Sequence, residues 1–263
     1  MKISVIIATK NEENNISRLL RSLKEQTFRD FETIIVDNNS SDQTKKIASK
    51  FTSKIFTHGP ERSTQRNYGL EKAIGKYILF LDADMELQKN VLGLCKNLME
   101  KQAKIAGIVI DEVSKGKSFL SKIKALEKSI YGAETELEAA RFFKKADLLK
   151  IGGYDKELIS GEDWDLSERI KKLGNLGRIN AKIIHYEKDS FYEDLKKKYY
   201  FAKHIQNYAR KHPKMFRKQA GFNRILLLFS KPRLIFKNPL EFSGLLFLKL
   251  AQYGVYLLAK SKQ

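Results

Sequence analysis

The sequence predicts an α/β protein in which helices flank a mostly parallel β-sheet and a basic helical appendage follows. Short apolar runs, such as residues 3–8 and 31–36, alternate with segments of helical periodicity, as in sheets whose strands are joined by crossover helices. The run 77–81 shows no alternation of apolar and polar residues, so both faces of this strand should be covered. Positive charge is concentrated after residue 195, which sets the C-terminal segment apart.

Charge divides the 263 residues into two parts. The chain has a net charge of +19, and residues 196–263 hold 16 of its 50 Lys and Arg but a single acid, Glu241. We therefore predict an α/β domain over residues 1–189 and a basic tail over 190–263 that meets an anionic partner. The single Cys95 excludes an intramolecular disulfide and fits a reducing compartment.

The elements of the first domain follow from hydrophobic periodicity and from glycine positions. The first helix should place Ile16, Leu19, Leu20 and Leu23 on one face. Residues 114–140 give the weakest pattern, with helical periodicity over 117–131. We expect strands at 3–8, 31–36, 55–57, 77–81, 105–110, 139–143 and 183–186, and helices at 61–74, 88–101, 147–151 and 162–173.

Two carboxylates follow the central strand. Asp82 and Asp84 are separated only by the small Ala83, and ligands of α/β sheets bind at the carboxyl ends of strands. Carboxylates two residues apart can point the same way, so they could hold Mg²⁺ or Mn²⁺, which in turn could hold a phosphate. Taken alone, this short pattern is explained as well by Asp82 capping the next helix and a solvated Asp84.

Polar residues also follow the first two strands. Thr9, Asn11 and Glu12 come after the first, and Asp37 comes after the second. An acid at the end of the second strand suits a ribose or a base edge. Because the sequence has neither a Gly-x-Gly-x-x-Gly after the first strand nor a P-loop motif, it does not favour a dinucleotide-binding or P-loop protein.

Two further clusters carry charge. Arg62 and Arg66 share a helix face, and a guanidinium there could pair with a diphosphate; for Arg62 a solvated position is an equal alternative. Glu162, Asp163 and Asp165 surround Trp164 at a helix start, where the helix dipole favours acids. Three acids exceed what a cap requires, so one could take a proton from an acceptor hydroxyl.

Six motifs occur in an order and at separations that resemble those of family 2 glycosyltransferases, which have the nucleotide-sugar-binding GT-A fold. The resemblance covers roughly residues 1–187. The motifs are SVIIATKNE (4–12), IIVDNNSSD (34–42), QRNYG (65–69), FLDAD (80–84), GGYD (152–155) and GEDWDL (161–166).

The resemblance implies roles for these residues. Asp163, next to Glu162, would be the general base of a single inverting displacement, a role that matters less if the acceptor is an anionic lipid phosphate. His185 would lie near the metal, although a hydrogen-bonded histidine at a strand end explains it equally well. Asp84 and Asp82 would hold Mg²⁺ or Mn²⁺. The donor site would comprise Thr9, Asn11, Glu12, Asp37, Arg66, Asn67, Asp82 and Asp84.

The implied function is a metal-dependent glycosyltransferase of the hexosyltransferase type. The resemblance favours a UDP-sugar over a GDP-sugar as the donor. The acceptor would be a glycan or a polyprenyl-phosphate-linked molecule. A sugar-phosphate nucleotidyltransferase is an alternative, but residues 8–12 lack the glycine-rich basic loop expected of one. A nucleic-acid-binding protein that uses the tail is another, disfavoured by the apolar runs 225–229 and 244–248. The third alternative is a catalytically inactive scaffold protein.

The tail contains two apolar segments, 222–236 and 242–259. The first is interrupted by Arg224, Lys231, Pro232 and Arg233, and the second has Lys249 inside its 18 residues. A spanning helix needs about 20 mostly apolar residues, and a mid-span Lys costs about 3 kcal/mol. We therefore expect helices that lie on the anionic cytoplasmic face of a membrane. Packing on the first domain, or formation of a homodimer, is the alternative.

Overall fold

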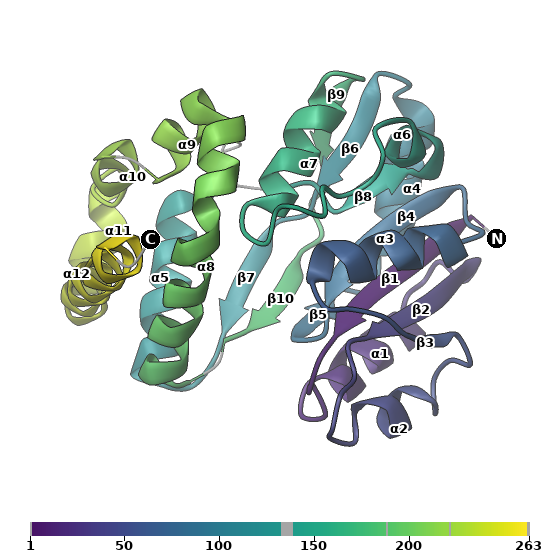
Figure 1. The fold of residues 1–263 in the computed structure, drawn as a ribbon, viewed down its shortest axis with the longest axis horizontal. Helices are drawn as coiled ribbons and strands as arrows, with labels where there is room; N and C mark the ends of the chain where they lie inside the picture. The colour runs from purple at the N-terminus through teal and green to yellow at the C-terminus, as the bar shows by residue number, and fades with distance from the viewer. Residues whose placement is uncertain (1, 133–138, 188, 221, 262–263) are drawn as a thin grey trace. The chain divides into compact units, whose positions relative to one another are not determined.

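The computed structural model describes residues 2–132, 139–187, 189–220 and 222–261. Two compact units result (Figure 1). The sheet unit comprises Met1–Asp111, Ala139–Lys156 and Glu162–Ile184, and the helical unit comprises Glu112–Glu138, Glu157–Gly161 and His185–Gln263. The predicted division of the chain into a catalytic domain (residues 1–189) and a basic tail (residues 190–263) stays a prediction.

A seven-stranded sheet with the order β3-β2-β1-β4-β8-β6-β9 forms the centre of the sheet unit. All of its pairings are parallel except those of β8, which runs antiparallel to both β4 and β6. Its strands are β1 (Ile3–Thr9), β2 (Phe31–Asp37), β3 (Ile55–Thr57), β4 (Tyr77–Asp82), β6 (Ile105–Val109), β8 (Phe142–Lys144) and β9 (Asn175–Arg178).

Helices cover both faces of this sheet. Residues of α1, α2 and α4 pack with one face, and residues of α3, α6 and α7 pack with the other. Because both faces are covered, every residue of β1 is buried, as its unbroken apolar pattern predicts. The helices are α1 (Ile16–Lys24), α2 (Thr44–Ala48), α3 (Arg62–Lys72), α4 (Val91–Lys101), α6 (Lys145–Lys150) and α7 (Glu162–Lys171).

The predicted fold class is confirmed, with local differences. The chain forms the short strand β5 (Met85–Leu87) directly after Asp84, so Asp82 does not cap a helix and α4 begins only at Val91. Strand β9 was not predicted from the sequence, because none of its residues is fully buried and Asn175 is exposed. Cys95 is fully buried in the core, where burial raises the pKa of its thiol and leaves it unreactive.

Helices dominate the other unit. A hydrophobic cluster joins α5, α12 and the segment after α10, with Ile123, Leu126, Leu245 and Leu248 among its buried members. The backbone N–H of Glu187 donates to the carbonyl of Lys115 at 3.3 Å, between the ends of β10 and β7. The elements are β7 (Glu112–Lys115), α5 (Phe119–Tyr131), the second half of β10 (Ile183–Tyr186), α8 (Phe191–Lys211), α9 (Pro213–Ala220), α10 (Phe222–Leu227), α11 (Pro232–Lys237) and α12 (Pro239–Ser261).

By length and composition, one helix of the described chain could cross a membrane. It is α12, with 23 residues, which is longer than the 18-residue apolar stretch seen in the sequence because its first turn begins at Pro239. These properties are weak evidence for a membrane span, because a core helix of a soluble protein can share them.

Candidate active site

Sheet register brings the polar strand ends together at one edge. Thr9 is level with Asp37 in the pairing of β1 with β2, and Ala8 is level with Asp82 in the pairing of β1 with β4. Because all three strands are parallel, these residues share the carboxyl edge of the sheet, where ligands of α/β proteins bind. Motifs more than 70 residues apart in the sequence thus meet at one site.

The loops after β1 and β2 are bonded to each other. The hydroxyl of Thr9 donates to Asp37 Oδ1 at 3.0 Å, and the backbone N–H of Ser41 donates to Asn11 Oδ1 at 2.9 Å. Asn11 adopts a left-handed conformation with φ 53°, and the Glu12 carboxylate accepts from Asn15 at 2.8 Å. These contacts hold the two loops together at the carboxyl edge of the sheet, where Thr9 and Asp37 are buried. Their contact with a nucleoside stays a prediction.

Arg66 lies between the carboxylates of two elements. Its Nη2 donates to Asp82 Oδ1 at 2.8 Å, and its Nη1 donates to Asp163 Oδ1 at 2.7 Å. Glu162 Oε1 lies 3.5 Å from Nη1. The guanidinium is fully buried, so it joins the end of β4 to the start of α7. Contact between Arg66 and a diphosphate, which the sequence predicted, would require it to leave these partners first.

Neighbouring charges fix the ionisation of the buried acids in opposite directions. Burial alone would raise the pKa of Asp82, but the positive charges of Arg66, Arg141 and Arg62 outweigh it and hold that pKa well below its ordinary value. Burial and the adjacent charge of Asp163 raise the pKa of Glu162, although Arg62 and Arg66 oppose the rise. Asp82 is therefore an ionised partner of arginines, whereas Glu162 holds its proton more readily than an ordinary glutamate.

Tyr154 contributes a contact that the sequence did not predict. Its hydroxyl donates to Asp163 Oδ1 at 3.0 Å, and its ring centroid lies 5.1 Å from the Arg66 guanidinium carbon. The Asn67 side-chain amide donates from Nδ2 to the Tyr154 carbonyl and accepts at Oδ1 from the Tyr154 backbone N–H, both at 2.8 Å. Gly153 permits this approach, because its φ is +68° and a Cβ there would lie 2.4 Å from Asn67 Oδ1. Asn67 therefore positions the Tyr154 loop, and its predicted contact with a donor is not tested.

Two arginines complete the cluster. Arg62 Nη2 lies 3.0 Å from Glu162 Oε1, so Arg62 pairs with the site acids instead of lying on a fully solvated helix face. Arg141 Nη1 lies 3.5 Å from Asp82 Oδ2. Sequence reasoning missed Arg141, because it precedes β8 and no local motif marks it. Only the antiparallel insertion of β8 beside β4 brings Arg141 to this edge.

The carboxylates that could face a ligand differ in accessibility. The Asp163 side chain is 29% exposed, whereas that of Glu162 is 4% exposed. A general base must reach the hydroxyl group that it deprotonates. Asp163 therefore suits the role of general base better than Glu162 does. Glu162 pairs with Arg62 and Arg66, and its catalytic role stays a prediction.

The carboxylates at the end of β4 could hold a metal ion only if the substrate supplies further ligands. Within the described residues no group of three or more His, Cys, Asp and Glu is arranged to hold a metal ion. Asp82 is engaged by Arg66 and Arg141, whereas Asp84 lies half-buried in the turn between β4 and β5. Mg²⁺ is commonly held by one or two carboxylates together with substrate phosphates and water. The residues therefore fit a metal shared with a diphosphate and not a preformed cage.

His185 belongs to the helical unit. Its Nδ1 lies 3.1 Å from Glu187 Oε1, the contact expected of a hydrogen-bonded histidine at the end of a strand. Its proposed approach to a metal therefore stays a prediction.

Comparison with known proteins agrees with this fold and edge. Residues 4–152 match the model of glycosyl transferase family 2. The chain is 30% identical over 181 residues to GalNAc(5)-diNAcBac-PP-undecaprenol beta-1,3-glucosyltransferase of Campylobacter jejuni, covering 61% of this chain and 57% of that protein. It is 27% identical over 198 residues to the amylovoran biosynthesis glycosyltransferase AmsB of Erwinia amylovora, covering 66% and 65%. The chain thus matches less than two thirds of the length of either relative.

Solved structures share the fold across 99% of this chain. Staphylococcus aureus TarS 1–349 in complex with UDP has a TM-score of 0.59 at 20% identity, with 90% of that chain covered. The mannosyltransferase PcManGT of Pyrobaculum calidifontis, in complex with GDP-Man and Mn²⁺, has a TM-score of 0.62 at 16% identity, with 86% covered. These solved structures share the arrangement of sheet and helices seen in this chain, which is the GT-A fold. The chain belongs to glycosyl transferase family 2, and it is an enzyme of that class, which confirms the resemblance seen in the sequence.

Proposed function

We propose that this enzyme moves a sugar from a nucleotide-sugar donor to a lipid-linked acceptor with inversion at the anomeric carbon, and we favour a UDP-sugar over a GDP-sugar as the donor. The observation that carries the proposal is the Asp82–Arg66–Asp163 bridge at the carboxyl edge of the sheet. It places a partly exposed carboxylate beside the strand ends that would hold the donor. The acceptor class is suggested by the undecaprenol-linked substrate in the name of the Campylobacter jejuni relative.

In the proposed reaction, Asp163 takes the proton of the acceptor hydroxyl as its oxygen attacks the anomeric carbon from the face opposite the diphosphate. The bond between sugar and diphosphate breaks, and the nucleoside diphosphate leaves with the electron pair. Arg66 and Tyr154 hold the Asp163 carboxylate in place, which keeps the base oriented before the substrate arrives. Glu162 anchors the helix start through Arg62.

Asp84 would hold Mg²⁺ or Mn²⁺ jointly with the donor diphosphate, whereas Asp82 would act mainly by fixing Arg66. The ion would supply positive charge that stabilises the leaving group. We expect Asp84→Ala to abolish transfer and to remove the metal-dependent part of nucleotide binding, measured by titrating UDP with and without Mn²⁺. Full transfer by this variant in EDTA would contradict the metal proposal.

A panel of UDP- and GDP-sugars with Mn²⁺, read by thermal unfolding, tests the donor proposal. A true donor at 100 times its dissociation constant should stabilise the protein by about 2.7 kcal/mol. Transfer of the stabilising sugar to a polyprenyl phosphate or to a lipid-linked glycan then tests the acceptor. Release of pyrophosphate from a nucleoside triphosphate and a sugar phosphate would instead support a nucleotidyltransferase.

The proposed site of action is the cytoplasmic face of a membrane, where lipid-linked acceptors are presented. The concentration of 16 Lys and Arg against one acid in residues 196–263 supports this placement, because anionic lipid headgroups attract such segments. Fractionation of cells that express the full chain tests the placement. Recovery only with the soluble proteins at low salt would exclude it.

A further inference from the structure

Helix α12 has two opposite apolar faces. One face carries Phe242, Leu245 and Leu248, which are buried in the cluster shared with α5. The other carries exposed side chains mostly at spacings of three and seven residues, so they form one stripe along the helix. The stripe consists of Leu240, Phe247, Leu250, Leu257 and Leu258, which are 47–75% exposed.

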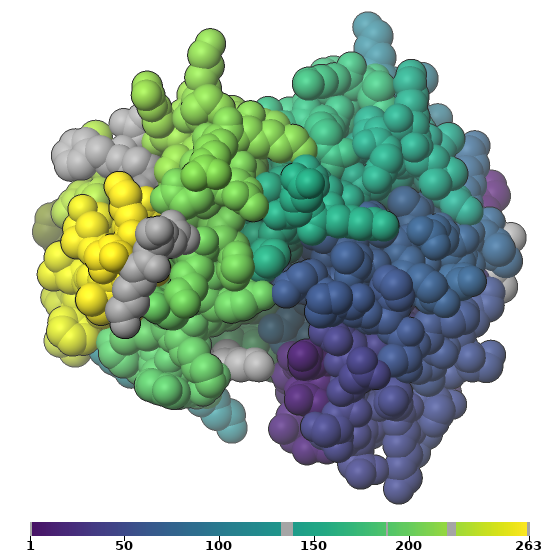
Figure 2. All heavy atoms as spheres, in the orientation of Figure 1, coloured from purple at the N-terminus to yellow at the C-terminus, as the bar shows by residue number. Residues whose placement is uncertain are grey.

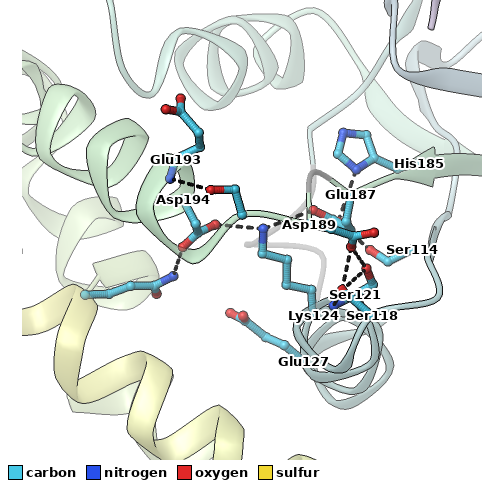
Figure 3. A network of polar contacts seen from close by, with 12 residues as sticks. Ser114, Ser118, Ser121, Lys124, Glu127, His185, Glu187, Asp189, Glu193 and Asp194 are labelled. Carbon is cyan, nitrogen blue, oxygen red and sulfur yellow. Dashed lines mark hydrogen bonds and ion pairs between the residues drawn. The ribbon is translucent and has the colours of Figure 1, made fainter. Parts of the chain in front are cut away.

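Polar contacts hold the buried face of α12 in place. Lys249 Nζ lies 2.5 Å from Glu127 Oε1 of α5, and the Gln252 side chain donates to Asp194 Oδ2 of α8 at 2.8 Å. Asp194 also pairs with Lys124 of α5 at 2.8 Å, within the network of Figure 3. The helix is therefore tied to α5 and α8 by charged and polar groups as well as by apolar packing.

These ties exclude a transmembrane position for α12 while the helical unit keeps this structure. A spanning helix would have to leave α5 and α8, separate Lys249 from Glu127, and carry its lysine into hydrocarbon, where a charge is costly. Lying parallel to a membrane surface requires none of these changes. In that orientation the exposed stripe can enter the headgroup region while the buried face keeps its partners.

Aromatic and cationic side chains accompany the stripe. Phe236 of α11 is 84% exposed, and it lies between the exposed Arg233 and Lys237. Phe229, before α11, is also exposed, and Lys260 is exposed at the end of α12. In the space-filling view the end of α12, in yellow, lies at the surface of the helical unit (Figure 2). Apolar side chains flanked by Lys and Arg are typical of surfaces that bind anionic bilayers.

We propose that this outer face, formed by the exposed side chains of α11 and α12, docks on an anionic lipid surface with α12 parallel to the membrane plane. Charge and apolar surface together favour a lipid surface over a second copy of the chain or a nucleic acid as the partner of this face. A second copy of the chain would bring the exposed Arg233, Lys237 and Lys260 of one face against those of another, which like-charge repulsion disfavours. Nucleic acid would match the charge but leave Phe236, Phe247 and Leu250 in water. The inference rests on the helical unit alone and not on the proposed reaction.

The test is flotation of the full chain with vesicles of phosphatidylcholine alone or with phosphatidylglycerol added. We expect binding to the mixed vesicles, weakened by salt, and at least a tenfold loss for Phe247→Ser/Leu250→Ser. Arg233→Gln/Lys237→Gln should reduce binding to the mixed vesicles and flatten its dependence on salt. Matched controls in the sheet unit are Ile74→Ser/Leu149→Ser, which are similarly exposed, and Lys45→Gln/Lys46→Gln; both should bind as the original chain does.

Three results would overturn the inference. The first is that the Phe247→Ser/Leu250→Ser variant binds vesicles as well as the original chain does, with an unchanged circular dichroism spectrum. The second is that the original chain forms a dimer but does not bind vesicles, and that the variant loses this dimer. The third is that the chain stays in membranes after treatment with alkaline carbonate, which indicates a spanning helix. The thermal unfolding shift of each variant on addition of UDP and Mn²⁺ reports donor binding by the sheet unit, independently of vesicle binding. Failure of the donor proposal would therefore leave this test unaffected.

Discussion

The sheet unit and the helical unit treat apolar surface in opposite ways. Among the described residues, three of the large exposed apolar side chains belong to the sheet unit and fifteen belong to the helical unit. Both faces of the sheet are covered by helices, whereas the helices of the other unit share one cluster. Large exposed apolar patches mark interaction sites in soluble proteins, and this difference is why we propose chemistry for the sheet unit and attachment for the helical unit.

Charge is arranged differently as well. In the sheet unit a fully buried arginine holds acids whose carboxylates reach the surface, as for Asp163. In the helical unit, Lys124 and Asp194 pair between helices and are both largely buried. In the proposed reaction, the first arrangement presents a proton acceptor to the substrate. The second only fixes helices, and this difference can be tested residue by residue.

The largest effect should come from Asp163→Asn. Loss of a general base lowers kcat by about 10²–10⁴-fold, while donor binding and vesicle binding should both be retained. Glu168→Gln, on the same helix but paired with Lys171 near the surface, is the control. Undiminished turnover of the Asn variant with a hydroxyl acceptor would show that the acids at the start of α7 serve only the helix.

Arg66→Met should be the most destabilising of these substitutions. It leaves Asp82 and Asp163 without their shared buried cation, and breaking such a pair costs about 3–5 kcal/mol. Lys72→Met, in the same helix, removes only exposed cation–π contacts with Phe56 and Tyr68, worth about 0.5–1 kcal/mol. Chemical denaturation measures both. Equal small losses would mean that the Arg66 bridge contributes little to the fold.

Tyr154→Phe should act on rate more than on binding. It removes a hydrogen bond to a charged group, worth about 1.5–3 kcal/mol, so we expect a roughly 10–100-fold lower kcat with a nearly unchanged KM for the donor. Tyr253→Phe, exposed on α12, should change neither value. A Tyr154→Phe variant that loses donor affinity and keeps kcat would assign Tyr154 to the donor pocket instead.

The smallest effect should come from Asp194→Asn in the helical unit. Burial would raise the pKa of Asp194, but hydrogen bonds from Lys124 and Gln252 outweigh it and lower the pKa. The folded protein then gains stability from this carboxylate above its unfolded pKa of about 3.9, and loses it as pH falls through the lower folded value. Asp194→Asn should therefore cost about 1.5 kcal/mol at pH 7 and progressively less in acid.

Unfolding followed between pH 7 and pH 3 measures this effect, with Glu193→Gln in the same helical turn as the control. A loss of stability that stays constant over this range would show that the Asp194 charge does not contribute. Transfer by the sheet unit should be unaffected at pH 7, which keeps the contrast between the two units testable.

Sequence alone determined the alternation of strands and helices and the order of the motifs. Both are written in local patterns, because hydrophobic periodicity and strand-end residues depend on near neighbours along the chain. The residues that follow β1, β2 and β4 could be assigned to one edge of the sheet for the same reason. The uneven charge of the tail was also visible without any structure.

Tertiary structure decided which of these residues touch. Arg66 pairs with Asp163 across 97 positions, and Arg141 reaches Asp82 only because β8 inserts antiparallel beside β4. The two faces of α12 are both apolar in sequence, and its contacts with α5 and α8, both apolar and with Glu127 and Asp194, select the one that turns inward. Such contacts depend on pairings between distant segments, and a local pattern carries no information about them.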